Sequence, residues 1–289
     1  MHTNPLHKQF NTDQFFPLEL VYQDTKLPHK ELPDHLHEWF ECVYVHEGSG
    51  IFFIDQAFYD MEAGDCFVIP SNTIHRAFPA EDNPVTSTAI FFSALLIPPT
   101  LLGESFSYLQ CYEQAKMRKS HKIRLSYSER HHVESLLDHM HEEWTKRTVG
   151  YRHAILLDLS AILLSLNRVS DTNRLPSKPA LIGPGWMQGI LLYIDEHPED
   201  NLNLAALAVR ASVSPAHLSR VFKQLTGLTI TEYVNAKRIL RACELLHSTD
   251  HSIHHIASQC GIHSLPHFHR IFKRITGTTP AIYKRENRS

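Results

Sequence analysis

The C-terminal part of this 289-residue chain contains a sequence that occurs twice. Leu204-Ala-Ala-Leu-Ala208 returns as Ile253-His-His-Ile-Ala257, at an offset of 49 residues. Further on, Arg-Val-Phe-Lys, Thr-Gly, Thr and Tyr within 220–233 return within 270–283, at an offset of 50, with Ile in place of Val. The extra residue falls in a turn, where a change of length costs least. Two copies are too few for a solenoid, so the repeat predicts two compact helix–turn–helix units.

The second helix of each copy carries its own start and stop signals. In the first copy Ser214 offers an N-cap hydroxyl, Pro215 begins the helix and Gly227 ends it. In the second copy Gly261 occupies the turn and Ser264 the cap. We therefore expect second helices over about 215–225 and 264–275, with one rigid helix from Thr231 to Leu246 fixing their separation.

Each second helix has one apolar face and one outer face that carries Arg and Lys. The apolar faces predict core residues, namely Leu218, Val221, Phe222, Phe268, Ile271 and Phe272. The outer faces have spacing i, i+3, i+4, i+7 and consist of Ala216, Ser219, Arg220 and Lys223, then Pro266, His269, Arg270 and Lys273. The major groove admits one helix, and Arg can bond guanine bidentately there. A single exposed Arg is usually only solvated, but equivalent arginines in two copies favour DNA contact by both helices.

The second copy also resembles a known family. The resemblance lies in Gly261-Ile-His-Ser264, Phe268-His-Arg270-Ile-Phe272-Lys273, Gly277-Thr-Thr-Pro280 and Tyr283-Lys-Arg285. This run is similar to the signature of the AraC/XylS family of transcription regulators. The resemblance implies a seven-helix domain with two recognition helices, whose base contacts would be Ala216, Ser219, Arg220, Pro266, His269 and Arg270. Pro266 departs from the polar residue usual in the family, and its side chain has no hydrogen-bonding group for direct readout.

Charge is distributed unevenly along the chain. Residues 181–289 hold 12 Lys and Arg against 8 Asp and Glu, a balance of +4, whereas residues 1–180 hold 16 against 23, a balance of −7. A modest cationic surplus beside an acidic part is what a DNA-binding domain tethered to another domain would show.

Composition places the chain among ordinary globular proteins, with 43% hydrophobic and 20% charged residues. No apolar run approaches the roughly 20 residues needed to span a bilayer, and residues 1–14 lack the apolar stretch of a secretory signal. The five cysteines form no CxxC pair, which disfavours a zinc ribbon or a disulfide framework. We therefore expect a cytoplasmic protein without a membrane partner.

The segment from about 15 to 95 has the pattern of short strands. Runs rich in β-branched and aromatic residues at 42–45, 51–54 and 66–69 are separated by turn clusters. Close, regular spacing of this kind predicts a small antiparallel barrel or sandwich.

The segment from about 126 to 169 changes to a helical period, broken at Thr148-Val-Gly150. It predicts a helical hairpin that either caps the barrel or pairs with a second chain; its second apolar stripe extends over more than one face, which favours a homodimer. A stretch rich in Pro and Gly follows. The predicted divisions are an effector-binding and dimerisation domain at 1–170, a linker at 171–184 and a DNA-binding domain at 185–289.

Polar residues recur at fixed spacing in the strand-rich segment. They form two motifs, His35-x-His37-x3-Glu41-x6-Gly48 and Gly64-x5-Pro70-x4-His75. This spacing resembles the two motifs of the cupins, with Asn72 standing where the second motif usually has glycine. The resemblance implies a cupin-like barrel.

Three interpretations of these polar residues remain open. His35, His37, Glu41 and His75 would form the polar floor of a pocket for a small hydroxylated ligand, with Trp39 beside it as a stacking surface or as barrel core. Alternatively, the same four residues would hold a divalent metal, or they would be structural. AraC-like proteins with such a barrel commonly sense sugars, so the resemblance implies a carbohydrate-like effector and no resident cofactor.

The predicted fold class is α+β with two domains, a cupin-like β-barrel with a helical hairpin and an all-α domain of seven helices with two helix–turn–helix motifs. The predicted function is a sequence-specific DNA-binding regulator, by resemblance an activator that works with RNA polymerase, and not an enzyme. Two alternatives are a metal-dependent cupin enzyme, such as a dioxygenase or isomerase with an appended DNA-binding domain, and an architectural protein that binds DNA constitutively.

Overall fold

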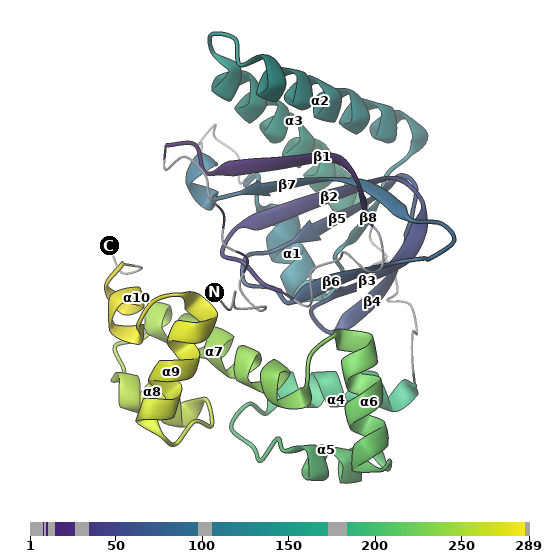
Figure 1. Ribbon diagram of the computed structural model, residues 1–289. Helices are drawn as coiled ribbons and strands as arrows, with labels where there is room; N and C mark the ends of the chain where they lie inside the picture. Colours follow the sequence, from purple (N-terminus) through teal and green to yellow (C-terminus); the bar gives the residue numbers. More distant parts are fainter. Residues whose placement is uncertain are drawn as a thin grey trace. The chain divides into compact units, whose positions relative to one another are not determined.

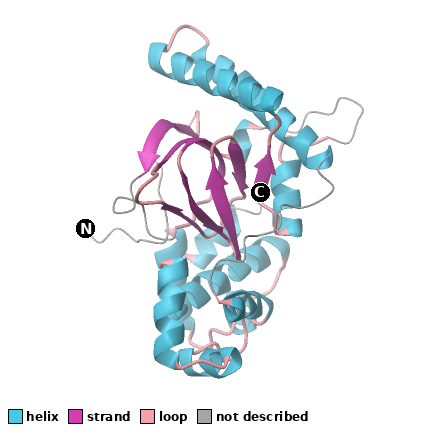
Figure 2. Cartoon of the chain, turned by 90° about the vertical axis from the view of Figure 1, so that its right-hand side faces the viewer, coloured by secondary structure: helices cyan, strands magenta, loops and turns pink. Residues whose placement is uncertain are grey.

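The computed structural model describes residues 8, 10, 15–26, 35–97, 106–172 and 184–286. The chain divides into two compact units. One is built chiefly from residues 37–180 with an N-terminal segment, and it contains all the strands of the described part of the chain (Figure 1). The other is built chiefly from Leu181–Ser289 and is helical (Figure 2). The predicted α+β class with a strand-rich first unit and an all-α second unit is confirmed.

The first unit contains two antiparallel sheets. The strands are β1 (Leu18–Lys26), β2 (Phe40–Glu47), β3 (Ser49–Ile54), β4 (Ala57–Glu62), β5 (Asp65–Ile69), β6 (His75–Pro79), β7 (Val85–Phe92) and β8 (Lys122–Arg124). One sheet has the order β1-β7-β2-β5-β8 and the other the order β4-β3-β6. Between them lies an apolar cluster with side chains from both sheets, including Val43, Phe52, Tyr59, Phe67 and Phe91. This is the predicted cupin-like barrel.

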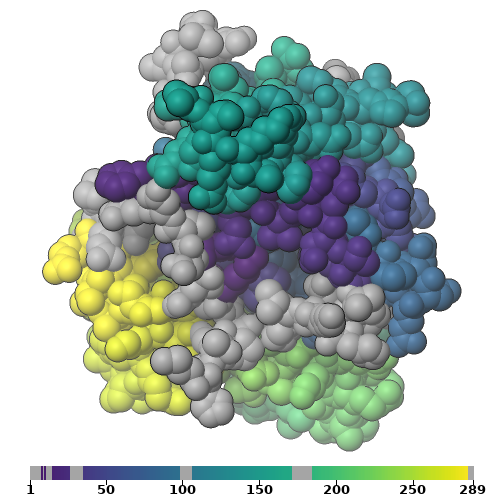
Figure 3. Space-filling model, turned by 45° about the horizontal axis from the view of Figure 1, so that its top comes forward, coloured from purple at the N-terminus to yellow at the C-terminus, as the bar shows by residue number. Residues whose placement is uncertain are grey.

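The larger sheet is also covered on its other face. The covering elements are α1 (Gln110–Arg118), α2 (Tyr127–Lys146) and α3 (Tyr151–Thr172). Outward-facing strand residues such as Cys42 and Tyr44 share one apolar cluster with the helices, and α2 lies against β1 (Figure 3). Because both faces of the sheet are buried, β2 (FECVYVHE) is apolar on both faces rather than alternating.

The predicted helical hairpin is present, and its apolar stripes are used within the chain. Both belong to the cluster against the sheet, including Val133, Leu137, Met140, Ile155, Leu159, Ile162, Leu163 and Leu166. Within the described residues, the segment Tyr151–Ser170 of α3 is long and apolar enough by composition to cross a membrane, which the composition alone did not lead us to expect. Six apolar side chains of this segment are buried at helical spacing, which explains its apolar character as that of a core helix.

The second unit contains seven helices between Pro184 and Glu286, as predicted. They are α4 (Gly185–Glu196), α5 (Leu204–Ala211), α6 (Pro215–Thr226), α7 (Ile230–Ser248), α8 (Ile253–Gln259), α9 (Leu265–Thr276) and α10 (Pro280–Glu286). The pairs α5–α6 and α8–α9 form the two helix–turn–helix units, and α7 contacts α6, α8 and α9. Residues 173–183 of the predicted linker lie outside the described residues, and α3 runs to Thr172.

The two copies of the repeat have the same internal packing. The ring of Phe222 lies 5.4 Å from that of Tyr233 at an interplanar angle of 78°, and Phe272 lies 5.6 Å from Tyr283 at the same angle. Both recognition helices end on a left-handed glycine, Gly227 at φ 79° and its counterpart in the second copy at φ 78°. The sequence repeat is therefore a repeat of packed structure, which makes α6 and α9 equivalent elements.

Candidate DNA-binding surface and barrel site

The predicted outer face of α6 is exposed. Ala216, Ser219, Arg220 and Lys223 all reach solvent, whereas the inner residues Leu218 and Phe222 are completely buried. The helix begins as expected, because the Ser214 side chain accepts a hydrogen bond from the backbone N–H of His217. The first recognition helix thus presents its predicted cationic stripe.

The outer face of α9 has the same arrangement with one difference. Pro266, Arg270 and Lys273 are exposed, but His269 is half-buried. Ser264 occupies the N-cap position, although its side chain makes no capping hydrogen bond in the described structure. The N-cap backbone of Ser264 has ψ 108° rather than the 149° of Ser214, and the predicted hydroxyl cap of the second copy is therefore wrong. The DNA contacts themselves stay predictions for all eight residues.

The barrel motifs bring three polar side chains together between the two sheets. His37 Nε2 lies 3.1 Å from Glu41 Oε2, and His75 Nε2 lies 2.9 Å from the same oxygen. Glu41 belongs to β2 of the larger sheet and His75 to β6 of the smaller one. All three side chains are at most 4% exposed. The sequence motifs therefore predicted a buried site that no single segment could form.

Backbone carbonyls fix the orientation of both imidazoles. His37 Nδ1 lies 2.8 Å from the carbonyl oxygen of Trp39, and His75 Nδ1 lies 2.8 Å from that of Thr73. A carbonyl only accepts, so Nδ1 carries the proton in both rings. Both Nε2 atoms then present a lone pair toward the Glu41 carboxylate when the rings are neutral. The contacts become attractive when a ring is protonated or when a donor or cation lies among the three groups.

Burial and charge act in opposite directions at this site. Desolvation lowers the pKa of His37, and the hydrogen bond to Glu41 opposes that change. Burial alone would raise the pKa of Glu41, but the facing His75 and His37 hold it well below its ordinary value. The lowered pKa of Glu41 therefore depends on a protonated imidazole facing the carboxylate.

The two remaining predicted barrel residues lie differently. The ligand atoms of His35, His37 and His75 all lie within 4.8 Å of one another, so His35 joins the cluster at its half-buried side. Trp39 stacks on Phe10, with ring centroids 4.3 Å apart and planes 6° apart. One face of Trp39 is therefore covered by Phe10, which the sequence motifs gave no reason to single out.

The turn before β6 explains the departure at Asn72. This residue has φ 58°, in the left-handed region where glycine is usual and Asn is tolerated. Its backbone N–H donates to the carbonyl of His37 at 2.7 Å. Asn72 therefore fulfils the conformational role of the glycine and ties the turn to the site.

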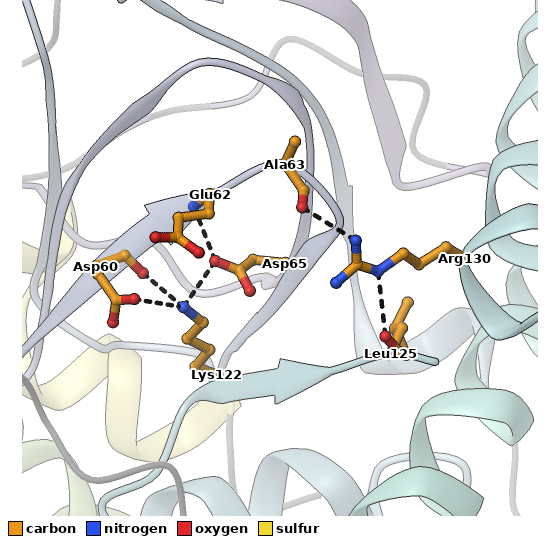
Figure 4. Close-up of polar contacts among 7 residues, drawn as sticks. All are labelled: Asp60, Glu62, Ala63, Asp65, Lys122, Leu125 and Arg130. Carbon is orange, nitrogen blue, oxygen red and sulfur yellow. Dashed lines mark hydrogen bonds and ion pairs between the residues drawn. The ribbon is translucent and has the colours of Figure 1, made fainter. Parts of the chain in front are cut away.

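A buried ion cluster holds the β4–β5 turn in place (Figure 4). Lys122 Nζ lies 2.7 Å from Asp65 Oδ2 and 3.2 Å from Asp60 Oδ2, and Arg130 of α2 donates to the carbonyl of Ala63. The side chain of Lys122 is 1% exposed. The cluster joins the strand pair to β8 and α2, and no motif or spacing in the sequence predicted it.

Comparison with known proteins assigns both units. Residues 25–91 match the model of the cupin domain family, and residues 207–286 match that of the helix-turn-helix domain family. The chain is 27% identical over 269 residues to the HTH-type transcriptional activator RhaS of Escherichia coli O6:H1, covering 92% of this chain and 93% of RhaS.

Solved structures are also similar. The C-terminal domain of AraT, a response regulator from Geobacillus stearothermophilus, is 32% identical and covers 38% of this chain and 91% of its own, with a TM-score of 0.36. ToxT from Vibrio cholerae is 13% identical and covers 93% of this chain and 98% of its own, with a TM-score of 0.37.

Proposed function

Because this chain belongs to the AraC/XylS family of DNA-binding transcription regulators, we propose that it is an activator controlled by a small hydroxylated ligand, such as a carbohydrate, held in its cupin barrel. The relative RhaS is a transcriptional activator, and we extend that role to this chain, acting on cytoplasmic DNA with RNA polymerase as its partner. DNA is the target of α6 and α9.

The observation that carries the ligand proposal is the His37–Glu41–His75 cluster. A few convergent polar groups surrounded by apolar side chains are the usual composition of a small-molecule site. The carboxylate accepts hydrogen bonds from ligand hydroxyls, and the lone pairs of the imidazole Nε2 atoms accept further ones. A donor-rich ligand would relieve the mutual repulsion of these acceptors, so a polyhydroxylated compound fits this site better than an anion.

Control of DNA binding follows from linkage. A ligand shifts an equilibrium between two arrangements of the protein only by the difference in its affinity for them. We propose that the ligand-bound barrel favours the arrangement in which α6 and α9 bind DNA as part of a homodimer. We place the contact between the two chains on the outward side of the α2–α3 hairpin, where Leu157 is 71% exposed.

A thermal-shift screen of the full chain with monosaccharides and polyols tests the ligand proposal. We expect one compound to raise the melting temperature, and His37→Ala to abolish that rise while leaving basal DNA binding intact. His46→Ala is the matched control, because His46 lies on the outward side of β2, the strand that carries Glu41, with its ring against Thr88. A normal ligand-induced shift in the His37 variant would remove this residue from the site.

The orientation of the two imidazoles supports a second candidate, a metal-dependent cupin. Rings that donate from Nδ1 to a carbonyl and offer Nε2 to a shared point are the usual second-shell arrangement of metal-binding histidines. With Glu41 and His35 they would complete a donor set for a divalent cation, which would supply Lewis acidity. Elemental analysis of protein purified without a metal-affinity tag decides between the two, because a stoichiometric metal favours this candidate and its absence favours the direct ligand site.

A further inference from the structure

Each recognition helix holds its outer arginine against a histidine three residues earlier. In α6, Arg220 Nη2 lies 3.2 Å from His217 Nδ1. In α9, Arg270 Nη2 lies 2.9 Å from His267 Nδ1. The two pairs stand 50 residues apart at equivalent positions of the repeat, so the same contact occurs in two independent surroundings.

Only one tautomer of the histidine allows this hydrogen bond. A guanidinium group only donates, so the imidazole Nδ1 accepts and the ring is neutral with its proton on Nε2. One N–H of the arginine is then occupied, and the others remain available in the planar fork that matches a guanine edge. The histidine restricts the arginine before DNA arrives without blocking the fork.

In the first copy the histidine is itself held in place. The backbone N–H of His217 donates to the Ser214 hydroxyl at 3.2 Å, and its ring lies 5.9 Å from that of Trp186 on α4 at an angle of 62°. His217 is half-buried, whereas His267 is exposed. The histidine of the first copy is therefore the more strongly restrained of the two.

We propose that His217 and His267 are positioning residues that orient Arg220 and Arg270 for base readout and so contribute to sequence specificity. Immobilising a long side chain at an interface costs binding free energy. Because the neighbouring imidazole already restricts the guanidinium in the free protein, less binding free energy is lost when the arginine is immobilised on DNA. The inference rests on the proposed base contacts of the two arginines.

The test uses the full chain and the DNA duplex that it binds most tightly among those selected from a randomised pool. Discrimination is the ratio of the Kd for a site with one base pair changed to the Kd for the intact site. We expect His217→Ala to lower discrimination by roughly two- to tenfold at the positions read by α6, with a smaller loss at the positions read by α9 for His267→Ala. His217→Asn, which keeps an acceptor near the place of Nδ1, should restore most of the loss.

A double-mutant cycle separates positioning from a general effect on the helix. In an Arg220→Ala background, His217→Ala should cause no further loss of discrimination, because the residue it positions is gone. His254→Ala, an exposed histidine on α8, is the matched control and should leave base preference unchanged. Melting temperatures of all variants report whether the helical unit still folds.

Two results would overturn the inference. An equal loss from His217→Ala with and without Arg220, or an Asn variant as poor as the Ala variant, would show that the histidine does not act through the arginine. A different result would locate the failure in the proposed function, because unchanged base preference in Arg220→Ala alone would remove the base contact on which the positioning depends.

Discussion

Replacing Lys122 with methionine should destabilise the barrel unit strongly. The ammonium group lies 2.7 Å from Asp65 Oδ2, and the two side chains are 1% and 6% exposed. Lys122→Met removes the charge but keeps an unbranched chain, so it leaves the buried Asp65 carboxylate without a counter-ion. Removing one partner of a buried pair costs about 3–5 kcal/mol. The carboxylate of Asp60 is 47% exposed, so its share is at most about 1 kcal/mol.

Urea unfolding measures this cost. Trp39 and Trp144 report on the barrel unit when Trp186 is replaced by Phe, and the midpoint with its slope gives the free energy of unfolding. Lys119→Met is the matched control, since Lys119 pairs with Asp55 at 2.8 Å but is 43% exposed. We expect the control to cost no more than about 1 kcal/mol.

A second variant tests the mechanism of the loss. Lys122→Met combined with Asp65→Asn should be more stable than Lys122→Met alone, because the uncompensated charge is gone while an amide oxygen can still accept from the Glu62 N–H. The reasoning is refuted if Lys122→Met costs no more than Lys119→Met, or if the added Asn brings no recovery.

The remaining predictions concern DNA binding and pH. Arg220→Ala and Arg270→Ala should each weaken specific binding by about 1–3 kcal/mol and relax base preference at different positions, measured by competition with altered duplexes. Lys223→Ala should weaken binding to all sequences alike and reduce the salt slope by about 1, measured by titration at several salt concentrations; a loss confined to one sequence would contradict a phosphate contact. Burial lowers the pKa of His121 from 6.5 to about 4, so the unfolded chain binds this proton first and the free energy of unfolding should fall as pH drops from 6.5 toward 4. His121→Gln should flatten that fall in urea titrations, and an unchanged pH profile would count against it.

Local pattern was enough to predict the helical unit. The cap, the following proline and the closing glycine around α6 are short-range signals, and similar signals occur again in the second copy of the repeat. The signal misled at Ser264, where the cap position was right but the side-chain bond is absent in the described structure, and the cap backbone has ψ 108° rather than the 149° of Ser214.

In the barrel, the sequence predicted the residues of the site better than their surroundings. His37, Glu41 and His75 follow from motif spacing, since turn geometry returns the chain to the same place between the sheets. The stacking of Phe10 on Trp39 and the burial of Lys122 both depend on contacts between segments far apart in the chain. Neither periodicity nor spacing carries information about such contacts.

The second stripe of the helical hairpin shows the same limit. Its apolar width favoured a contact with a second chain, yet Ile155, Leu159 and Ile162 are completely buried against the sheet of the same chain. A helix that packs against both a sheet and a neighbouring helix needs a wide apolar face. The width of the apolar face therefore indicates that the helix has more than one packing partner, but it does not identify those partners.

Selection of duplexes from a randomised pool by the full chain tests most directly whether α6 and α9 read DNA as equivalent helices. We expect an enriched site in which each protomer reads two short elements about 10 base pairs apart, of which Arg220→Ala erases one and Arg270→Ala the other. Enrichment of no sequence, or loss of the same element in both variants, would contradict it.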